Sequence, residues 1–88
     1  MTVEVSVTKT PNENALKFNC SQSVLESGYK TYNSVEKASE SPVAAKIFET
    51  NGVTSVFLML DFITVTKKPE TNWEVIQTSI IDAIKTTL

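Results

Sequence analysis

The side chains that most often carry catalysis are scarce in this sequence. It has no histidine and a single cysteine, so no serine or cysteine can be paired with a histidine base. Histidine is the usual general base at neutral pH, and a nucleophilic serine or cysteine needs such a base beside it. Carboxylate pairs at helical spacing remain, Glu36 with Glu40 and Glu70 with Glu74, but such pairs are most often a solvated helix face. We therefore expect a protein that is not an enzyme.

Cys20 is the one thiol of the chain, and two roles are open for it. Its position in phase with Leu16 and Phe18 predicts a small buried residue with an unreactive thiol. The alternative is a thiolate at a strand end, offered to a metal cluster or to a partner cysteine. One cysteine makes neither an internal disulfide nor a closed tetrahedral metal site. We expect no bound metal or cofactor, and a cytoplasmic location because the N-terminus also lacks an export signal.

Charge and hydropathy argue against two large classes of partner. Ten acidic residues outweigh eight lysines, and the lysines are scattered apart from Lys67 and Lys68. Binding along a nucleic acid needs clustered cations, so we expect no nucleic-acid partner. Apolar runs all fall short of the roughly 18 residues that span a bilayer, so we expect no membrane partner. The length of 88 residues predicts one domain over residues 1–88.

The N-terminal half predicts a β-hairpin followed by an irregular stretch. Valines alternate with polar residues at its start, which is typical of a strand with one buried face. Proline and asparagine then favour a chain reversal. The elements expected here are strands over 3–9 and 16–20, a turn over 10–14, a short extended piece at 29–33 and one helical turn at 34–38.

The C-terminal half predicts two helices with a second hairpin between them. Ser41 followed by Pro42 is a helix-start signal, and Gly52 is a stop signal. Thr71 with Glu74 predicts a capping box for the last helix, in which isoleucines recur at helical spacing. The elements expected here are a helix over 42–50, strands over 53–60 and 62–66, and a helix over 72–86.

The order of these elements, ββαββα, predicts an α+β two-layer sandwich. We expect a mainly antiparallel four-stranded sheet with both helices on one face. The opposite face is then left to solvent or to a partner. Its expected residues are polar: Glu4, Ser6, Thr8, Lys17, Asn19, Thr64 and Thr66.

The strand over 53–60 carries more apolar residues than one buried face can absorb. Both parities of the run from Val56 to Leu60 are apolar, whereas a strand covered on one side should alternate. Burial on both sides beneath residues 21–41, a bulge, or an exposed partner-binding patch would each explain the run. The predicted partner contacts are Phe57, Leu58, Met59, Leu60, Asp61 and Phe62, with the turn residues Pro11 and Asn12 as a second candidate.

A set of short motifs runs in order along nearly the whole chain. They are Thr10-Pro11-Asn12 with Asn14, Leu16-Lys17-Phe18, Ser41-Pro42 with Ile47-Phe48, Gly52-Val53, Val56-Phe57, Asp61-Phe62-Ile63-Thr64-Val65-Thr66-Lys67 and Trp73-Glu74. Together they resemble the N-terminal domain of Nfu-type (NifU-like) iron-sulfur scaffold proteins. In that family a CxxC motif in a separate C-terminal domain holds the cluster, and no cysteine follows Cys20 here. The resemblance therefore implies the domain that recognises partners or recipient proteins rather than the cluster site.

The function implied by this resemblance is that of an accessory protein-interaction module in iron-sulfur cluster assembly or delivery, without a cluster-binding CxxC of its own. Its expected partner is an assembly protein or a recipient protein, including a CxxC-bearing scaffold that acts in trans. Two alternatives stay open. One is an iron or cluster carrier that uses Cys20 across a dimer, and the other is an unrelated protein-binding adaptor that reuses the fold.

Overall fold

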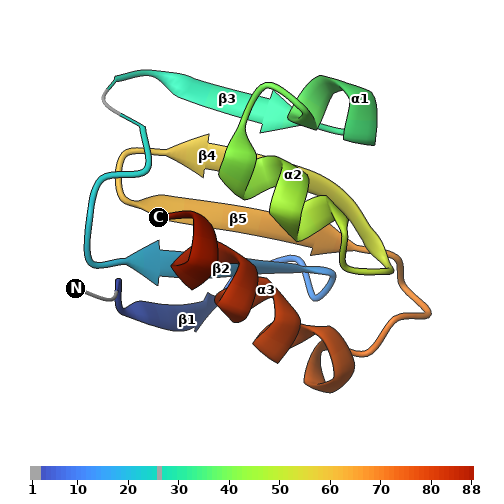
Figure 1. Cartoon of the computed structure of the whole chain (residues 1–88). Helices are drawn as coiled ribbons and strands as arrows, with labels where there is room; N and C mark the ends of the chain where they lie inside the picture. Colours follow the sequence, from blue (N-terminus) through green and yellow to red (C-terminus); the bar gives the residue numbers. More distant parts are fainter. Residues whose placement is uncertain (1–2, 26) are drawn as a thin grey trace.

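Residues 3–25 and 27–88, described by a computed structural model, form five strands and three helices (Figure 1). The strands are β1 (Val5–Lys9), β2 (Ala15–Cys20), β3 (Tyr29–Tyr32), β4 (Val53–Met59) and β5 (Phe62–Lys67). The helices are α1 (Val35–Ala38), α2 (Pro42–Phe48) and α3 (Trp73–Thr87). The strands pair antiparallel in the order β1-β2-β5-β4-β3, and the helices lie on one face of the sheet (Figure 1). Within these residues, no helix is long and apolar enough to cross a bilayer.

The predicted α+β sandwich is confirmed in outline, but the predicted number of strands and helices is wrong. The sheet has five strands instead of four, because the extended piece expected at 29–33 is β3 and pairs with β4. The helical turn expected at 34–38 is α1, so the observed order is βββααββα. Pairing with β3 gives main-chain partners to the outer edge of β4, which would otherwise be a long exposed edge.

Capping side chains explain where the longer helices begin. Ser41 Oγ accepts a hydrogen bond from the Ala44 amide, and proline takes the first helical position of α2, as the sequence predicts. The capping box predicted for α3 is wrong by one residue. Asn72 is the cap, and its Oδ1 accepts from the Glu74 amide at 2.9 Å. Asparagine is as good an acceptor as threonine there and stands directly before the first helical residue.

The core lies between the sheet and the helices. One row of side chains from the three central strands is buried there: Leu16, Phe18, Cys20, Val56, Leu58, Ile63 and Val65. Ile47 of α2 and Ile80 and Ile84 of α3 are fully buried members of the same cluster. Burying a large aliphatic or aromatic side chain contributes about 1.5–3 kcal/mol. This burial holds the helices on one face and leaves the other face free of them.

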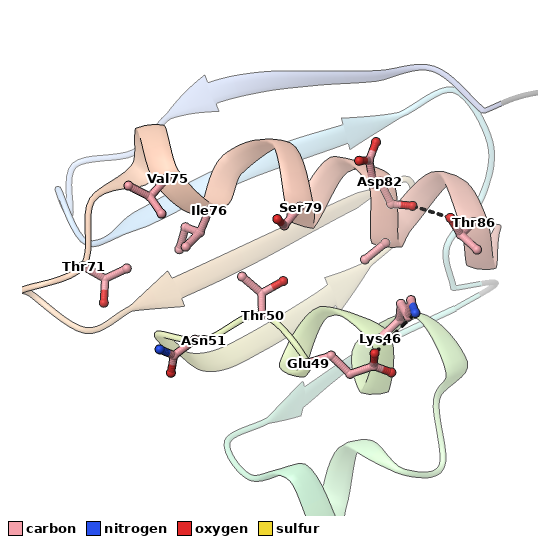
Figure 2. Close-up of a pocket in the computed structure, with 11 residues that line it drawn as sticks. Lys46, Glu49, Thr50, Asn51, Thr71, Val75, Ile76, Ser79, Asp82 and Thr86 are labelled. Atoms are coloured by element: carbon pink, nitrogen blue, oxygen red, sulfur yellow. Dashed lines mark hydrogen bonds and ion pairs between the residues drawn. The ribbon is translucent and has the colours of Figure 1, made fainter.

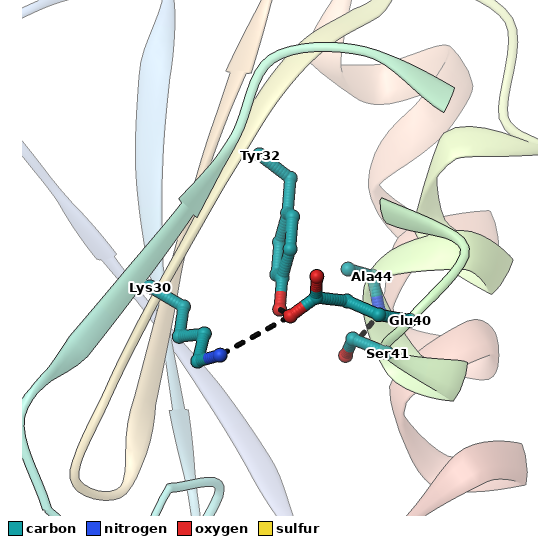
Figure 3. A network of polar contacts seen from close by, with 5 residues as sticks. All are labelled: Lys30, Tyr32, Glu40, Ser41 and Ala44. Carbon is teal, nitrogen blue, oxygen red and sulfur yellow. Dashed lines mark hydrogen bonds and ion pairs between the residues drawn. The ribbon is translucent and has the colours of Figure 1, made fainter. Parts of the chain in front are cut away.

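A polar network ties the edge strand β3 to the helical layer (Figure 3). Glu40, between α1 and α2, accepts from Lys30 Nζ at 3.1 Å and from Tyr32 Oη at 3.0 Å, in both cases through Oε2. Burial, with the Glu40 hydrogen bond second, raises the pKa of Tyr32. The hydrogen bond from Lys30, followed by that from Tyr32, lowers the pKa of Glu40. The network therefore adds a side-chain link to the helical layer to the main-chain pairing of β3 with β4.

Candidate functional site

The sheet face that points away from the helices, called the open face below, carries an aromatic row across three strands. The row consists of Tyr29 on β3, Phe57 on β4 and Phe62 on β5. The ring centroids of Tyr29 and Phe57 lie 5.7 Å apart in a stacked arrangement, and those of Phe57 and Phe62 lie 6.2 Å apart. Met59 is the cross-strand partner of both Tyr29 and Phe62 and lies beside the row. An apolar surface therefore extends from the sheet edge to its central strand.

Lys17 on β2 marks the end of the aromatic row. Its Nζ lies 4.4 Å from the centroid of the Phe62 ring, which is a cation–π contact. Beyond Lys17 the open face is polar, as the sequence predicts. The strand register places Thr8 and Thr64 on either side of Lys17, and Asn19 Nδ2 donates to Thr8 Oγ1 at 2.9 Å. The open face thus has a cation at the boundary between an apolar half and a polar half.

The predicted contacts on β4 and β5 divide between this face and the core. Phe57, Met59 and Phe62 are half-buried on the open face. Leu58 is 2% exposed, so its side chain is not accessible to a partner in this conformation. Successive strand residues point to opposite faces, and Leu58 is in the phase that faces the helices. The apolar run therefore supplies the core with one parity and the aromatic half of the open face with the other.

The turn between β4 and β5 contains the predicted contacts Leu60 and Asp61. Leu60 is 52% exposed and has a φ of 48°, a left-handed conformation that costs a residue with a side chain about 1–2 kcal/mol. Its carbonyl accepts from the amides of Val24 and Leu25 at 2.7 and 3.0 Å, and the Asp61 carbonyl accepts from the Cys20 amide at 2.8 Å. The loop after β2 therefore holds this turn as it passes toward β3 (Figure 1).

The second predicted contact region, the exposed turn with Pro11 and Asn12, lies at the other end of β2. Asn12 Oδ1 accepts from the Asn14 amide at 2.9 Å, which is an Asx turn. Trp73 Nε1 donates to the Glu13 carbonyl at 3.0 Å and fixes the turn to the start of α3. The structure therefore does not bring the two predicted contact regions together.

A buried lysine at the end of β5 donates a hydrogen bond to this turn. Lys67 is 7% exposed, and its Nζ donates to Asn14 Oδ1 at 3.1 Å and to the Lys68 carbonyl at 3.3 Å. The same Nζ lies 5.7 Å from the centroid of the Trp73 ring. These neutral acceptors and the ring face replace the water that a buried ammonium loses. Lys67 thus joins the turn, the end of β5 and the start of α3.

Cys20 is a buried free cysteine on the helix side of β2, which confirms the prediction of a core residue. Burial, with a smaller effect of the Asp61 carboxylate, raises the pKa of the Cys20 thiol from 9.0 to about 11. Nucleophilic attack and metal binding both need the thiolate. The protonated, buried thiol is therefore poorly suited to either role.

A groove of about 600 Å³ lies between α2 and α3 on the helical side (Figure 2). Several of its polar side chains already bond within their own helix or its cap. Lys46 Nζ pairs with Glu49 Oε1 at 3.3 Å, and Thr86 Oγ1 donates to the Asp82 carbonyl at 2.7 Å. The groove has the contacts of an ordinary helix surface, so the open face is the stronger candidate for a functional site.

Tyr29 and Lys17 complete the open-face site, although neither belongs to the partner contacts predicted from the sequence. Tyr29 is 67% exposed, and it reaches the row only because β3 belongs to the sheet. The sequence signal that could have identified Tyr29 was the pair of apolar residues Phe57 and Met59, because apolar side chains on an outer face favour apolar neighbours on the adjacent strand. The contact of Lys17 with Phe62 depends on the register of β2 against β5.

Comparison with known proteins places the chain in a family. The family described as scaffold protein Nfu/NifU N terminal matches residues 5–88. The chain is 34% identical to the mitochondrial NifU-like protein 4 of Arabidopsis thaliana over 94% of this chain and 29% of that protein. It is 41% identical to the human mitochondrial NFU1 iron-sulfur cluster scaffold homolog over 85% of this chain and 30% of that protein. The chain therefore spans less than a third of the length of these curated relatives.

Solved structures agree with this assignment. The crystal structure of Staphylococcus aureus protein SAV1430 has a TM-score of 0.79 and 30% identity, over 91% of this chain and 96% of that chain. The solution structure of a NifU-like protein from Saccharomyces cerevisiae has a TM-score of 0.84 and 28% identity, over 97% of this chain and 77% of that chain. The chain belongs to the family of Nfu/NifU scaffold N-terminal domains.

Proposed function

We propose that this chain is a non-catalytic protein-interaction module in the assembly or delivery of iron-sulfur clusters. The observation that carries the proposal is the aromatic row on a sheet face that the helices leave open. Family membership supplies the process, since the human relative is described as an iron-sulfur cluster scaffold homolog. The partner in this proposal is an assembly protein or a recipient protein, including a scaffold that carries a CxxC motif.

The aromatic row has the side chains that are typical of a protein-binding surface. Tyrosine and other large aromatic side chains dominate the binding energy of many interfaces, because they bury much area and lose little conformational freedom. Tyr29 is largely exposed, while Phe57 and Phe62 are already half-buried by their neighbours. A partner would therefore meet rings that are held in place by stacking and by the sheet.

The state of Cys20 argues against the alternative of a cluster carrier. Such a carrier would need the Cys20 thiolate of each of two chains at the surface, whereas this thiol is buried and its pKa is raised to about 11. In this proposal the thiolates that hold a cluster are therefore other than that of Cys20. We also propose a reducing compartment such as the cytoplasm, in which a lone thiol stays free.

Genetic complementation tests this proposal. Deleting the gene in the native cell should lower the activity of an iron-sulfur dehydratase and leave a cluster-free dehydrogenase unchanged. The wild-type chain should restore the dehydratase activity. Phe57→Asp should not restore it, because burying an unpaired carboxylate against the partner is costly. The matched control is Val75→Asp, on an exposed part of α3. Unchanged dehydratase activity after deletion would refute the proposed role.

A further inference from the structure

We propose that the open face binds a partner segment that carries carboxylates beside aromatic or long aliphatic side chains. This inference deepens the proposed function and rests on it, because it takes the open face as the interaction surface and adds the chemistry of the partner. Two properties of the described residues carry it. They are the unmatched charge of Lys17 and the spacing of the aromatic row.

Lys17 supplies the charge that a partner would match. Among the described strand residues it is the one charged side chain on the open face, since Lys9, Lys30 and Lys67 are in the phase of the helix side. Within the described part of the chain, no carboxylate lies within ion-pairing distance of Lys17. Its ammonium is instead held over the Phe62 ring.

The carboxylates of this region stand away from Lys17, at the ends of strands. Glu4 precedes β1, and Asp61 lies in the turn before β5. A carboxylate from a partner could therefore approach Lys17 without meeting a like charge among the strand residues of the open face. Closing the interface over Phe62 would also remove water from the ion pair, which strengthens the attraction.

The spacing of the row fits side chains that follow one another along a segment. The ring centroids of Tyr29 and Phe57 are 5.7 Å apart and those of Phe57 and Phe62 are 6.2 Å apart, and the Lys17 ammonium lies over the Phe62 ring, 4.4 Å from its centroid. Residues on one side of an extended segment repeat about every 6.6 Å, and one helical turn rises about 5.4 Å. Either backbone can set two apolar side chains on the rings and a carboxylate at Lys17.

A second copy of this chain and a nucleic acid fit the open face less well. A second copy presents another Lys17 in the middle of the face and has a carboxylate in the same phase, Glu4, only beyond the start of β1, so its charges match the Lys17–Phe62 contact less well. A nucleic acid binds through many phosphates at once and needs several clustered cations. An acidic, apolar protein segment matches both halves of the Lys17–Phe62 contact.

A peptide selection tests this inference without knowledge of the natural partner. The probe is a random 12-residue peptide library displayed on phage and panned against the immobilised full chain. Enriched peptides should combine Asp or Glu with Phe, Tyr, Trp or Leu. A synthetic copy of the most enriched peptide is then titrated by fluorescence anisotropy. Phe57→Ala should weaken its binding at least about tenfold, as loss of an aromatic anchor does.

Charge reversal gives the sharper result. Lys17→Glu should weaken the same peptide about tenfold, and salt should weaken its binding to the wild type more than to the variant. The matched controls are Lys9→Glu, on the neighbouring strand and the opposite side, and Val75→Ala on α3, and both should stay within about twofold because they lie outside the open face. Circular dichroism and the urea midpoint verify that each variant is folded. Phe57→Leu is a milder substitution, because it removes the ring but keeps a large apolar side chain.

Several outcomes would overturn the inference. They are enrichment of basic peptides, failure to enrich any peptide, or binding that neither Phe57→Ala nor Lys17→Glu alters in folded protein. A dimer in light scattering that Phe57→Ala dissociates would show that a second copy occupies the face. The gene deletion above is independent of this selection, so a cluster defect without acidic peptides would refute this inference and leave the proposed function standing.

Discussion

The reactivity of Cys20 is the prediction that most directly tests the assignment of a core thiol. Raising the pKa from 9.0 to about 11 lowers the fraction of thiolate at pH 8 from about one tenth to about one thousandth. Alkylation by iodoacetamide proceeds through the thiolate. The native chain should therefore react about a hundredfold more slowly at pH 8 than the chain unfolded in guanidinium chloride, and restricted access slows it further.

The assay is the alkylated fraction by intact-mass spectrometry, followed over time from about pH 7 to 11. Cys20→Ser gives the background from other groups. Asp61→Asn should raise the native rate only modestly, because burial is the larger cause of the shift and the Asp61 charge the smaller. The pKa is higher in the folded chain than in the unfolded chain, so the contribution of this thiol to stability is complete below pH 9.0 and is lost as pH rises toward 11.

A native alkylation rate within about threefold of the unfolded rate at pH 8 would refute this reasoning. So would a native inflection near pH 9.0, the ordinary value for the thiol. Either result would mean that the strand end opens and exposes the sulfur, and the carrier alternative would then regain support. Anaerobic reconstitution with iron and sulfide provides a second readout, in which we expect no thiolate-to-iron absorption that depends on Cys20.

Three further predictions concern stability and are measured by urea unfolding. Leu58→Ala should cost about 2–5 kcal/mol because Leu58 is a core residue, whereas Met59→Ala on the open face should cost under about 1.5 kcal/mol; equal costs would contradict the assigned phase of β4. Gly52→Ala should cost about 1–3 kcal/mol, because φ is +106° and the new Cβ would lie 2.7 Å from the Thr71 side chain. Gly28→Ala is its matched control, with φ +70° and nothing within 4 Å of the new Cβ, so it should cost less. The Glu40 pKa is lowered from 4.5 by Lys30 and Tyr32, so its contribution is present above pH 4.5 and is lost as pH falls further. Glu40→Gln should therefore flatten the acid side of the pH–stability profile, and an unchanged profile would show that the Glu40 contacts do not persist in solution.

The sequence predicted the elements whose signals are local. The serine and proline at the start of α2 act through nearest neighbours, and the alternating strands beside the first turn need only a period of two. β3 was recognised as an extended piece but not as part of the sheet. Its short sequence, Tyr29 to Tyr32, lacks a clear apolar face. Its membership depends on pairing with β4, which is a nonlocal fact that local propensity cannot supply.

The candidate site shows the same division between local and nonlocal information. The apolar surplus of β4 allowed burial on both sides, a bulge or a surface patch, and Phe57 and Met59 lie half-buried on the open face. The predicted contacts also included Leu58, which lies in the core, because an apolar run does not show which parity faces the helices. That parity follows from packing against α2 and α3, and a shift by one residue would exchange the two faces.

The pairing of β2 with β5 sets the order in which this chain is expected to fold. It joins Leu16 to Val65, whereas β1 with β2 and β4 with β5 are neighbours along the chain. Forming this β2–β5 seam closes a loop that contains β3, α1, α2 and β4, and the entropy lost in closing a loop grows with its length. The two hairpins should therefore form early, and their docking should limit the folding rate. Changes along the seam should slow folding, while changes in the edge strand β3 should mainly speed unfolding.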